Sequence, residues 1–107
     1  MIETKIYIGL NHKETKRQEF DSEKYVSILR YVCFSYHLPF SFCFQEGGYF
    51  HENGDFVEEK TIVLSIIDMP ADTIIEMARD LCAFFNQESV LVTQGEVKRY
   101  FVSDKVG

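Results

Sequence analysis

The stretch Thr61-Ile62-Val63-Leu64-Ser65-Ile66-Ile67, followed by Asp68-Met69-Pro70, decides the fold of this 107-residue chain. The run of seven is mostly β-branched and apolar on both faces, as is typical of a buried strand. Pro70 favours a helix start because proline loses nothing in the first turn of a helix and fixes φ near the helical value. Apolar residues then recur at helical spacing and form one stripe: Ile74, Ala78, Leu81, Cys82 and Phe85. Residues 89–93 repeat the strand pattern, so the central unit is strand, helix, strand.

The N-terminal half has the same order of elements. Residues 5–10 alternate between faces and predict a first strand. The polar residues 11–18 that follow indicate either a solvated loop or a small anion-binding rim. Asp21 or Ser22 caps a first helix, which ends before Pro39 because proline disfavours the α conformation in the residue before it. Residues 40–45 alternate strictly and predict a second strand, whose Phe side chains meet the helices.

Glycine pairs separate the remaining strands. Gly47-Gly48 indicates a bulge or bend, and Asn53-Gly54 is the strongest short hairpin signal in the chain. A hairpin with Tyr49, Phe50 and Phe56 near its tip is therefore expected between the second and third strands. Gln94-Gly95 predicts a turn, and residues 97–102 predict a last strand beside the fourth.

These elements predict a single domain over residues 1–107 of the α+β class. The order is the βαββαβ pattern of ferredoxin-like folds, a two-layer sandwich with an antiparallel sheet, two helices on one face and an added C-terminal strand. Val63, Ile67 and Leu91 then lie on the sheet face that the helices leave open. An apolar open face favours a homo-oligomer that packs sheet to sheet.

Composition excludes several classes of function. The formal net charge is −6, which disfavours a nucleic-acid-binding surface. The N-terminus lacks the pattern of a signal peptide and no apolar run is long enough to cross a membrane, so we expect a cytoplasmic protein. The three cysteines and three histidines lack metal-ligand spacing, and we expect buried thiols in a reducing compartment, no metal and no cofactor.

Short motifs give one resemblance. Gly48-Tyr49, then Glu59-Lys60-Thr61 opening an apolar strand, then Asn86-Gln87-Glu88-Ser89-Val90 at the junction of helix and strand form a pattern that resembles small uncharacterised bacterial and phage proteins of ferredoxin-like type. The resemblance implies the fold and a shared site near these residues. It implies no activity, because ferredoxin-like domains host enzymes, regulators and RNA binders alike.

Polar residues at the ends of the predicted elements are the candidate binding residues: Asn11, Tyr49, His51, Glu59 and Gln87. Asn11 follows the first strand and Glu59 opens the antiparallel third strand, so the two are expected to approach each other. Gln87 is expected at the opposite end of the third strand, roughly 20 Å from Glu59. No motif for a catalytic residue occurs in the sequence.

Three functions follow as hypotheses. The first is a non-enzymatic oligomeric binding or regulatory module that takes a protein partner or a small-molecule ligand. The second is a small acid–base enzyme with an aromatic pocket near Glu59 and His51. The third is a phage-type inhibitor that acts on a host protein through its acidic surface.

Overall fold

The computed structural model describes residues 1–105 and consists of four strands and two helices. The strands are β1 (Ile2–Gly9), β2 (Ser41–Phe50), β3 (Phe56–Ile67) and β4 (Leu91–Glu96). The helices are α1 (Ser22–Ser35) and α2 (Ala71–Phe84). The order along the chain is therefore β-α-β-β-α-β, as the sequence predicts.

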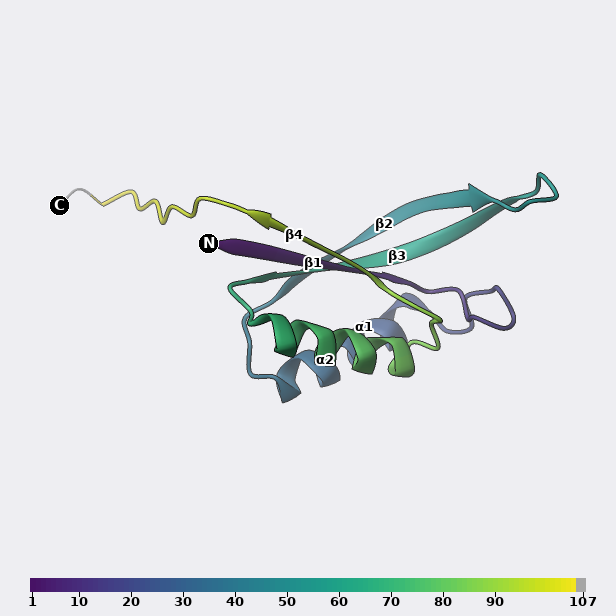
Figure 1. The fold of residues 1–107 in the computed structure, drawn as a ribbon, viewed down its shortest axis with the longest axis horizontal. Helices are drawn as coiled ribbons and strands as arrows, with labels where there is room; N and C mark the ends of the chain where they lie inside the picture. The colour runs from purple at the N-terminus through teal and green to yellow at the C-terminus, as the bar shows by residue number, and fades with distance from the viewer. Residues whose placement is uncertain (106–107) are drawn as a thin grey trace.

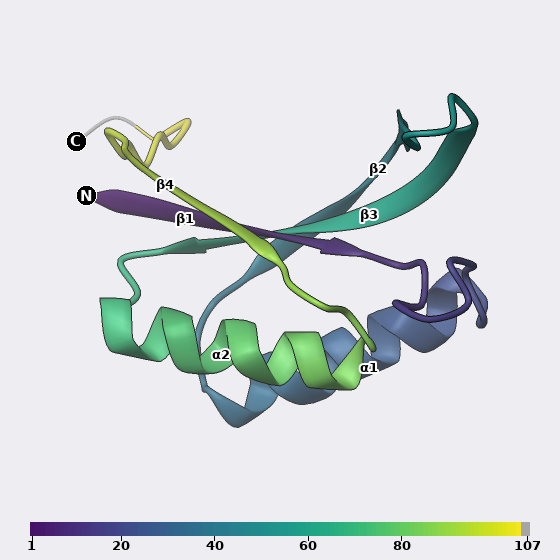
Figure 2. The same cartoon turned by 45° about the vertical axis from the view of Figure 1, so that its right-hand side comes forward.

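All four strands form one antiparallel sheet in the order β2-β3-β1-β4. Both helices lie on the same face of this sheet (Figures 1 and 2). This arrangement confirms the ferredoxin-like α+β fold and leaves β2 and β4 as the two edge strands. In the part of the chain that the structure describes, no helix is long and apolar enough to span a membrane.

The core lies between the sheet and the helices. It contains the inward residues of β1 and β3 and the apolar stripe of each helix: Ile6, Ile8, Leu29, Val32, Ile62, Leu64, Ile66, Ile74, Met77 and Leu81. Burial of such side chains stabilises a fold by about 1.5–3 kcal/mol each. Of the stripe predicted for the second helix, Ile74, Leu81 and Phe85 are buried, whereas Ala78 and Cys82 are half-buried. Met77, which the predicted stripe left out, is fully buried.

The first helix begins as the sequence indicates. Asp21 is its N-cap, and the side chain of Asp21 accepts a hydrogen bond from the Lys24 backbone amide at 3.0 Å. Helix α2 follows Pro70, which is its N-cap residue and makes no side-chain cap bond. A proline side chain has no acceptor for the first helical amides, and the Thr73 amide donates instead to the Asp72 side chain at 3.0 Å.

Two predicted boundaries are wrong. Strands β2 and β3 run much further toward the hairpin tip than the sequence indicates, so that only residues 51–55 form the turn. Gln94 and Gly95 belong to β4 rather than to a turn, and the predicted strand at 97–102 does not form. The physical reason for the second difference is that Gln94 and Gly95 stay paired with Thr4 and Glu3 of β1, so the chain does not turn back to place a strand beside β4.

Truncation of Leu81 tests the position of the core. Leu81 is fully buried on α2, and Leu81→Ala should lower the free energy of unfolding by about 2–5 kcal/mol through lost burial and a residual cavity. Ile75 lies on the same helix but is exposed, so Ile75→Ala should cost less than about 1 kcal/mol. Urea unfolding of both variants measures the difference. Equal losses would place α2 differently on the sheet.

Candidate functional site

Three segments of the chain converge at one end of the sheet: the end of β1, the start of β3 and the approach to β4. Strand β1 lies between β3 and β4 and is antiparallel to both, so both neighbours begin where β1 ends. Asn11 follows β1, Glu59 lies near the start of β3 and Gln87 precedes β4. The topology therefore gathers these three polar residues at one end.

The position predicted for Gln87 is wrong. Its side-chain Nε2 donates a hydrogen bond to the Asn11 backbone carbonyl at 2.6 Å, and the Asn11 backbone amide donates to Glu59 Oε2 at 3.1 Å. One residue, Asn11, thus links Gln87 to Glu59. The sequence-based expectation of a distant Gln87 assumed that the fourth strand is antiparallel to the third. In the fold β4 pairs with β1 instead and starts at the same end as β3.

Asn11 is held from several sides. Its side-chain amide donates to the Glu58 backbone carbonyl at 3.1 Å, which fixes it against β3. The bond from its backbone amide to Glu59 confirms the expected approach of these two residues. Because both bonds join the end of β1 to the start of β3, the Glu59 carboxylate has a defined position rather than a freely rotating one.

Gly9 makes room for the Glu59 carboxylate. A Cβ atom on Gly9 would lie 2.6 Å from Glu59 Oε2 and 2.7 Å from its carboxyl carbon, so the carboxylate occupies the space that any other side chain would fill. Gly47 is the cross-strand partner of Glu59 on β2, and it too has no side chain. Glycine in a strand is typical of a place where another group approaches the backbone closely.

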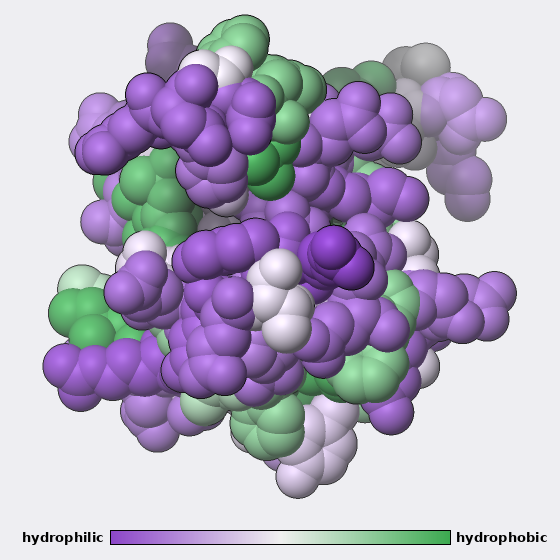
Figure 3. Space-filling model, turned by 90° about the vertical axis from the view of Figure 1, so that its right-hand side faces the viewer, coloured by the Kyte–Doolittle hydropathy of each residue, from purple (hydrophilic) through white to green (hydrophobic). Residues whose placement is uncertain are grey.

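Shallow hollows open on both sides of this carboxylate. Tyr49 and Glu59 together line two of them, with volumes of about 200 and 160 Å³. The smaller hollow also includes Lys13, Lys16 and Gln87. The end of the molecule that carries these residues is mainly hydrophilic, with apolar side chains toward the hairpin (Figure 3). We call Asn11, Tyr49, Glu59 and Gln87 the Glu59 site.

His51 lies outside this group. It follows β2 at the tip of the hairpin, and its ring contacts that of Tyr49 with 5.4 Å between centroids. Along the strand it is four residues beyond Gly47, the partner of Glu59, which corresponds to roughly 13 Å. The structure therefore brings four of the five predicted binding residues together and leaves His51 at a distance from Glu59.

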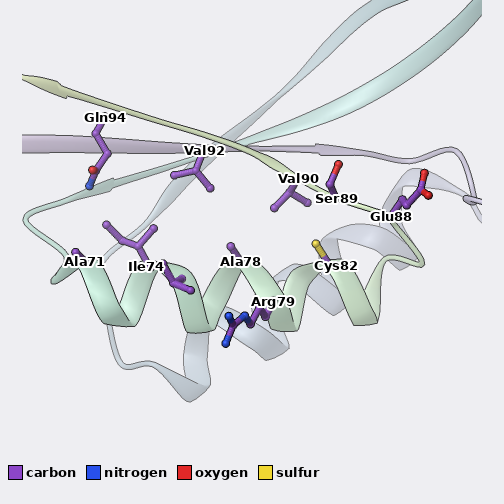
Figure 4. A pocket seen from close by; sticks show the side chains of 11 residues that line it. Ala71, Ile74, Ala78, Arg79, Cys82, Glu88, Ser89, Val90, Val92 and Gln94 are labelled. Carbon is purple, nitrogen blue, oxygen red and sulfur yellow. The ribbon is translucent and has the colours of Figure 1, made fainter.

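A separate hollow, away from Glu59, lies between α2 and β4 (Figure 4). The sequence did not predict it. Its volume is about 390 Å³, and its walls are mainly apolar: Ile74, Ile75, Ala78, Val90 and Val92. The side chains of Ile74 and Val92 face each other across it. The helical spacing of apolar residues predicts that a helix packs against the sheet. The same spacing does not show whether that packing is closed or leaves a gap. Its polar groups do not converge as those around Glu59 do.

Nucleophile and metal chemistry have little support elsewhere. Among residues 1–105, no three His, Cys, Asp or Glu side chains lie close enough together to hold a metal ion. Burial raises the pKa of the Cys33 thiol to about 12, so Cys33 is a poor nucleophile. Cys43 is exposed on β2, which corrects the expectation that all three thiols are buried.

No protein-family model and no curated protein sequence matches the chain. Solved structures do match. A phage SAM lyase in complex with S-methyl-5'-thioadenosine is 24% identical with a TM-score of 0.66, over 89% of this chain and 80% of that one. The same kind of enzyme in its apo state is 22% identical with a TM-score of 0.65, over 88% and 78% of the chains.

The periplasmic divalent cation tolerance protein CutA from Archaeoglobus fulgidus is also similar. It is 11% identical with a TM-score of 0.57, and the match covers 92% of this chain and 87% of that one. Likenesses at these identities show a shared fold. They agree with the resemblance of the sequence to small bacterial and phage proteins of ferredoxin-like type.

Substitution of Gly9 tests the packing around Glu59. In Gly9→Ala the new methyl group must displace the carboxylate and break its bond from Asn11, which should cost about 0.5–1.5 kcal/mol of stability. In the background of Glu59→Ala the same change should cost little, so a double-mutant cycle should give a clear coupling energy. Thermal unfolding measures all four proteins. Gly95→Ala is the control, because nothing lies within 4 Å of a Cβ atom there. Additive effects would contradict the close packing.

Proposed function

We propose that this protein is a lyase that binds S-adenosylmethionine at the Glu59 site. The observation that carries the proposal is the Glu59 carboxylate itself, which accepts a hydrogen bond from Asn11, lies against Gly9 and lines three hollows that a ligand could enter. A carboxylate in such a place suits a cationic ligand. Support for the ligand class comes from the structural neighbour, a phage SAM lyase that holds S-methyl-5'-thioadenosine.

The bond that such a reaction breaks follows from the two molecules. S-Methyl-5'-thioadenosine keeps the adenosyl and methyl groups of S-adenosylmethionine, so the bond between sulfur and Cγ of the amino-acid chain is the one that is lost. Its electron pair goes to sulfur and neutralises the sulfonium charge. We propose that the carboxylate of the substrate closes on Cγ and forms a lactone. Atoms and charge then balance without water and without a proton transfer.

This chemistry limits what Glu59 does. Because the positive charge on sulfur disappears as the bond breaks, a carboxylate fixed against sulfur would stabilise the substrate more than the transition state. The amino group keeps its charge throughout the reaction. We therefore propose that Glu59 binds the amino group and orients the chain for ring closure, which is a gain from proximity. Tyr49 offers an aromatic face beside it for the adenine base.

The two hollows that Tyr49 shares with Glu59 are smaller than the roughly 300–1,000 Å³ of typical ligand pockets, whereas a third hollow beside Glu59, lined also by Phe56 and Lys60, has a volume of about 530 Å³. A nucleoside that stacks on Tyr49 would need a further wall, which a second copy of the chain would supply. We propose that copies associate through the open sheet face, where Cys43, Val63, Tyr7 and Leu91 form one row across the four strands. Leu91 is 60% exposed in a single chain.

The non-enzymatic binding module and the host-protein inhibitor remain predictions from the sequence. The same open face would serve the binding module, whereas the inhibitor would use the acidic hairpin. Neither accounts for a carboxylate that Asn11 holds against Gly9. The enzyme proposal does, and it replaces the acid–base role suggested by the sequence with binding and orientation of the substrate.

Neutralisation of Glu59 tests the proposed reaction. The wild-type protein should convert S-adenosylmethionine to S-methyl-5'-thioadenosine and homoserine lactone in equal amounts, as measured by liquid chromatography with mass spectrometry. Glu59→Gln should lower the rate by roughly 10- to 150-fold, since hydrogen bonds to charged groups contribute about 1.5–3 kcal/mol. Glu58→Gln is the matched control, because neighbouring residues of a strand point to opposite faces. No turnover by the wild type, or equal rates for both variants, would reject the proposal.

Thiol labelling tests the sheet-face association. Cys43 is exposed on the open face, so it should react rapidly with an aromatic disulfide reagent at low protein concentration. As the concentration rises and copies associate, its reaction rate should fall at least tenfold. Cys33 is buried in the core and should react slowly at every concentration. A Cys43 rate that is independent of protein concentration would contradict association through this face.

A further inference from the structure

Residues 97–105, which we call the C-terminal arm, leave the sheet without a partner strand. The backbone amide of Val97 donates to the Met1 carbonyl at 2.9 Å, which is the last bond between the two ends of the chain. Beyond it, residues 98–105 belong to no strand. Tyr100, Phe101 and Val102 are 76%, 87% and 92% exposed, so three consecutive large side chains lie almost wholly in water. Such a group is typical of an interaction site.

The opposite end of the molecule carries a similar extension. Strand β1 pairs with β3 only as far as Thr61, so residues 47–59, which we call the hairpin arm, reach past the other strands. Phe50 and Phe56 form an edge-to-face pair at 5.0 Å near its tip, and Phe50 is 72% exposed. Strand β2 is an edge of the sheet, and its outer side has unpaired backbone groups.

The two arms have opposite charge. The hairpin arm, with Glu46 beside it, carries five acidic residues and no Lys or Arg. The C-terminal arm carries three basic residues and one acidic residue in a protein whose net charge is −6. Arg99 also lies over the ring of Phe101 at 5.1 Å, so charge and aromatic surface occur together in the arm. The arms are therefore complementary in charge and alike in their exposed aromatic groups.

The arms cannot meet within one chain. They project from opposite ends of the molecule, whose longest extent is 60 Å against 27 and 25 Å in the other directions (Figure 1). We infer that the C-terminal arm of one copy pairs as an added strand with the hairpin arm of a second copy. The strand that it pairs with is β2, along its outer edge. Backbone hydrogen bonds along the edge then give affinity, and the aromatic and charged side chains give register.

This contact joins two different surfaces, so after a first contact the pair of copies still has one free C-terminal arm and one free hairpin arm. Such a head-to-tail interface forms a ring if the rotation between copies closes and a chain if it does not. It does not depend on the reaction proposed for the Glu59 site. It also differs from packing between open sheet faces, where the same surface contributes from both copies.

Complementary variants test the inference. The arm variant Arg99→Glu/Phe101→Ser and the hairpin variant Phe50→Ser/Glu52→Lys each remove one exposed aromatic ring and reverse one charge. Sedimentation velocity across about 1–100 µM should show that each alone associates at least tenfold more weakly than the wild type. An equimolar mixture should regain association, because the intact arm of one variant fits the intact hairpin of the other. Contact between sheet faces alone predicts no such recovery.

Controls separate this result from a loss of folding. Phe34→Ser removes an aromatic ring that is 64% exposed on α1, against 72% for Phe50 and 87% for Phe101, and should leave association unchanged. The circular dichroism spectra and thermal unfolding of all variants should match those of the wild type. If the hairpin variant unfolds, the association of the C-terminal arm variant tests the inference by itself. A wild type that stays at 12.5 kDa over the whole range, an arm variant that associates normally or a mixture without recovery would each overturn the inference.

Discussion

The pairing of β1 with strands on both sides is the interaction on which the rest of the structure depends. Every inward residue of β1 from Thr4 to Leu10 is buried, and β1 receives β3 on one edge and β4 on the other. The chain reaches this arrangement by burying the apolar stripes of both helices on one face of the sheet. Once β1 is central and antiparallel to both neighbours, the starts of β3 and β4 must lie together. The Glu59 site is a consequence of that geometry.

The length of β1 has a second consequence. It is shorter than β2 and β3, and it begins almost at the N-terminus of the chain. The hairpin therefore extends past one end of β1, and residues 97–105 extend past the other. Exposed aromatic side chains collect on both extensions because neither can be covered by the two helices, which lie under the middle of the sheet (Figure 2). A small two-layer core thus leaves exposed aromatic surface at both ends.

Acidic and basic side chains also lie on different parts of the surface. The acidic residues of the hairpin lie next to the Glu59 site, whereas Lys13 and Lys16 line the smaller hollow beside the same carboxylate. A ligand with a cationic centre and an anionic group would meet both kinds of charge within a short distance. This arrangement agrees with a zwitterionic amino-acid chain such as that of S-adenosylmethionine. The same arrangement fits a polyanion poorly, because the net charge of the protein is negative.

The sequence by itself determined the identity and order of the six elements, a cap at Asp21 or Ser22 and three of the buried residues of the second helical stripe, Ile74, Leu81 and Phe85. These features depend on residues close together in the chain, and their periodicity is local. It also predicted the approach of Asn11 to Glu59, because the first and third strands of this pattern are neighbours. Only the tertiary structure decided that Gln87 joins them, that His51 lies apart from Glu59 and that residues 97–102 form no strand. Each of these depends on which strands are paired and where a partner strand ends, and local periodicity carries no information about either.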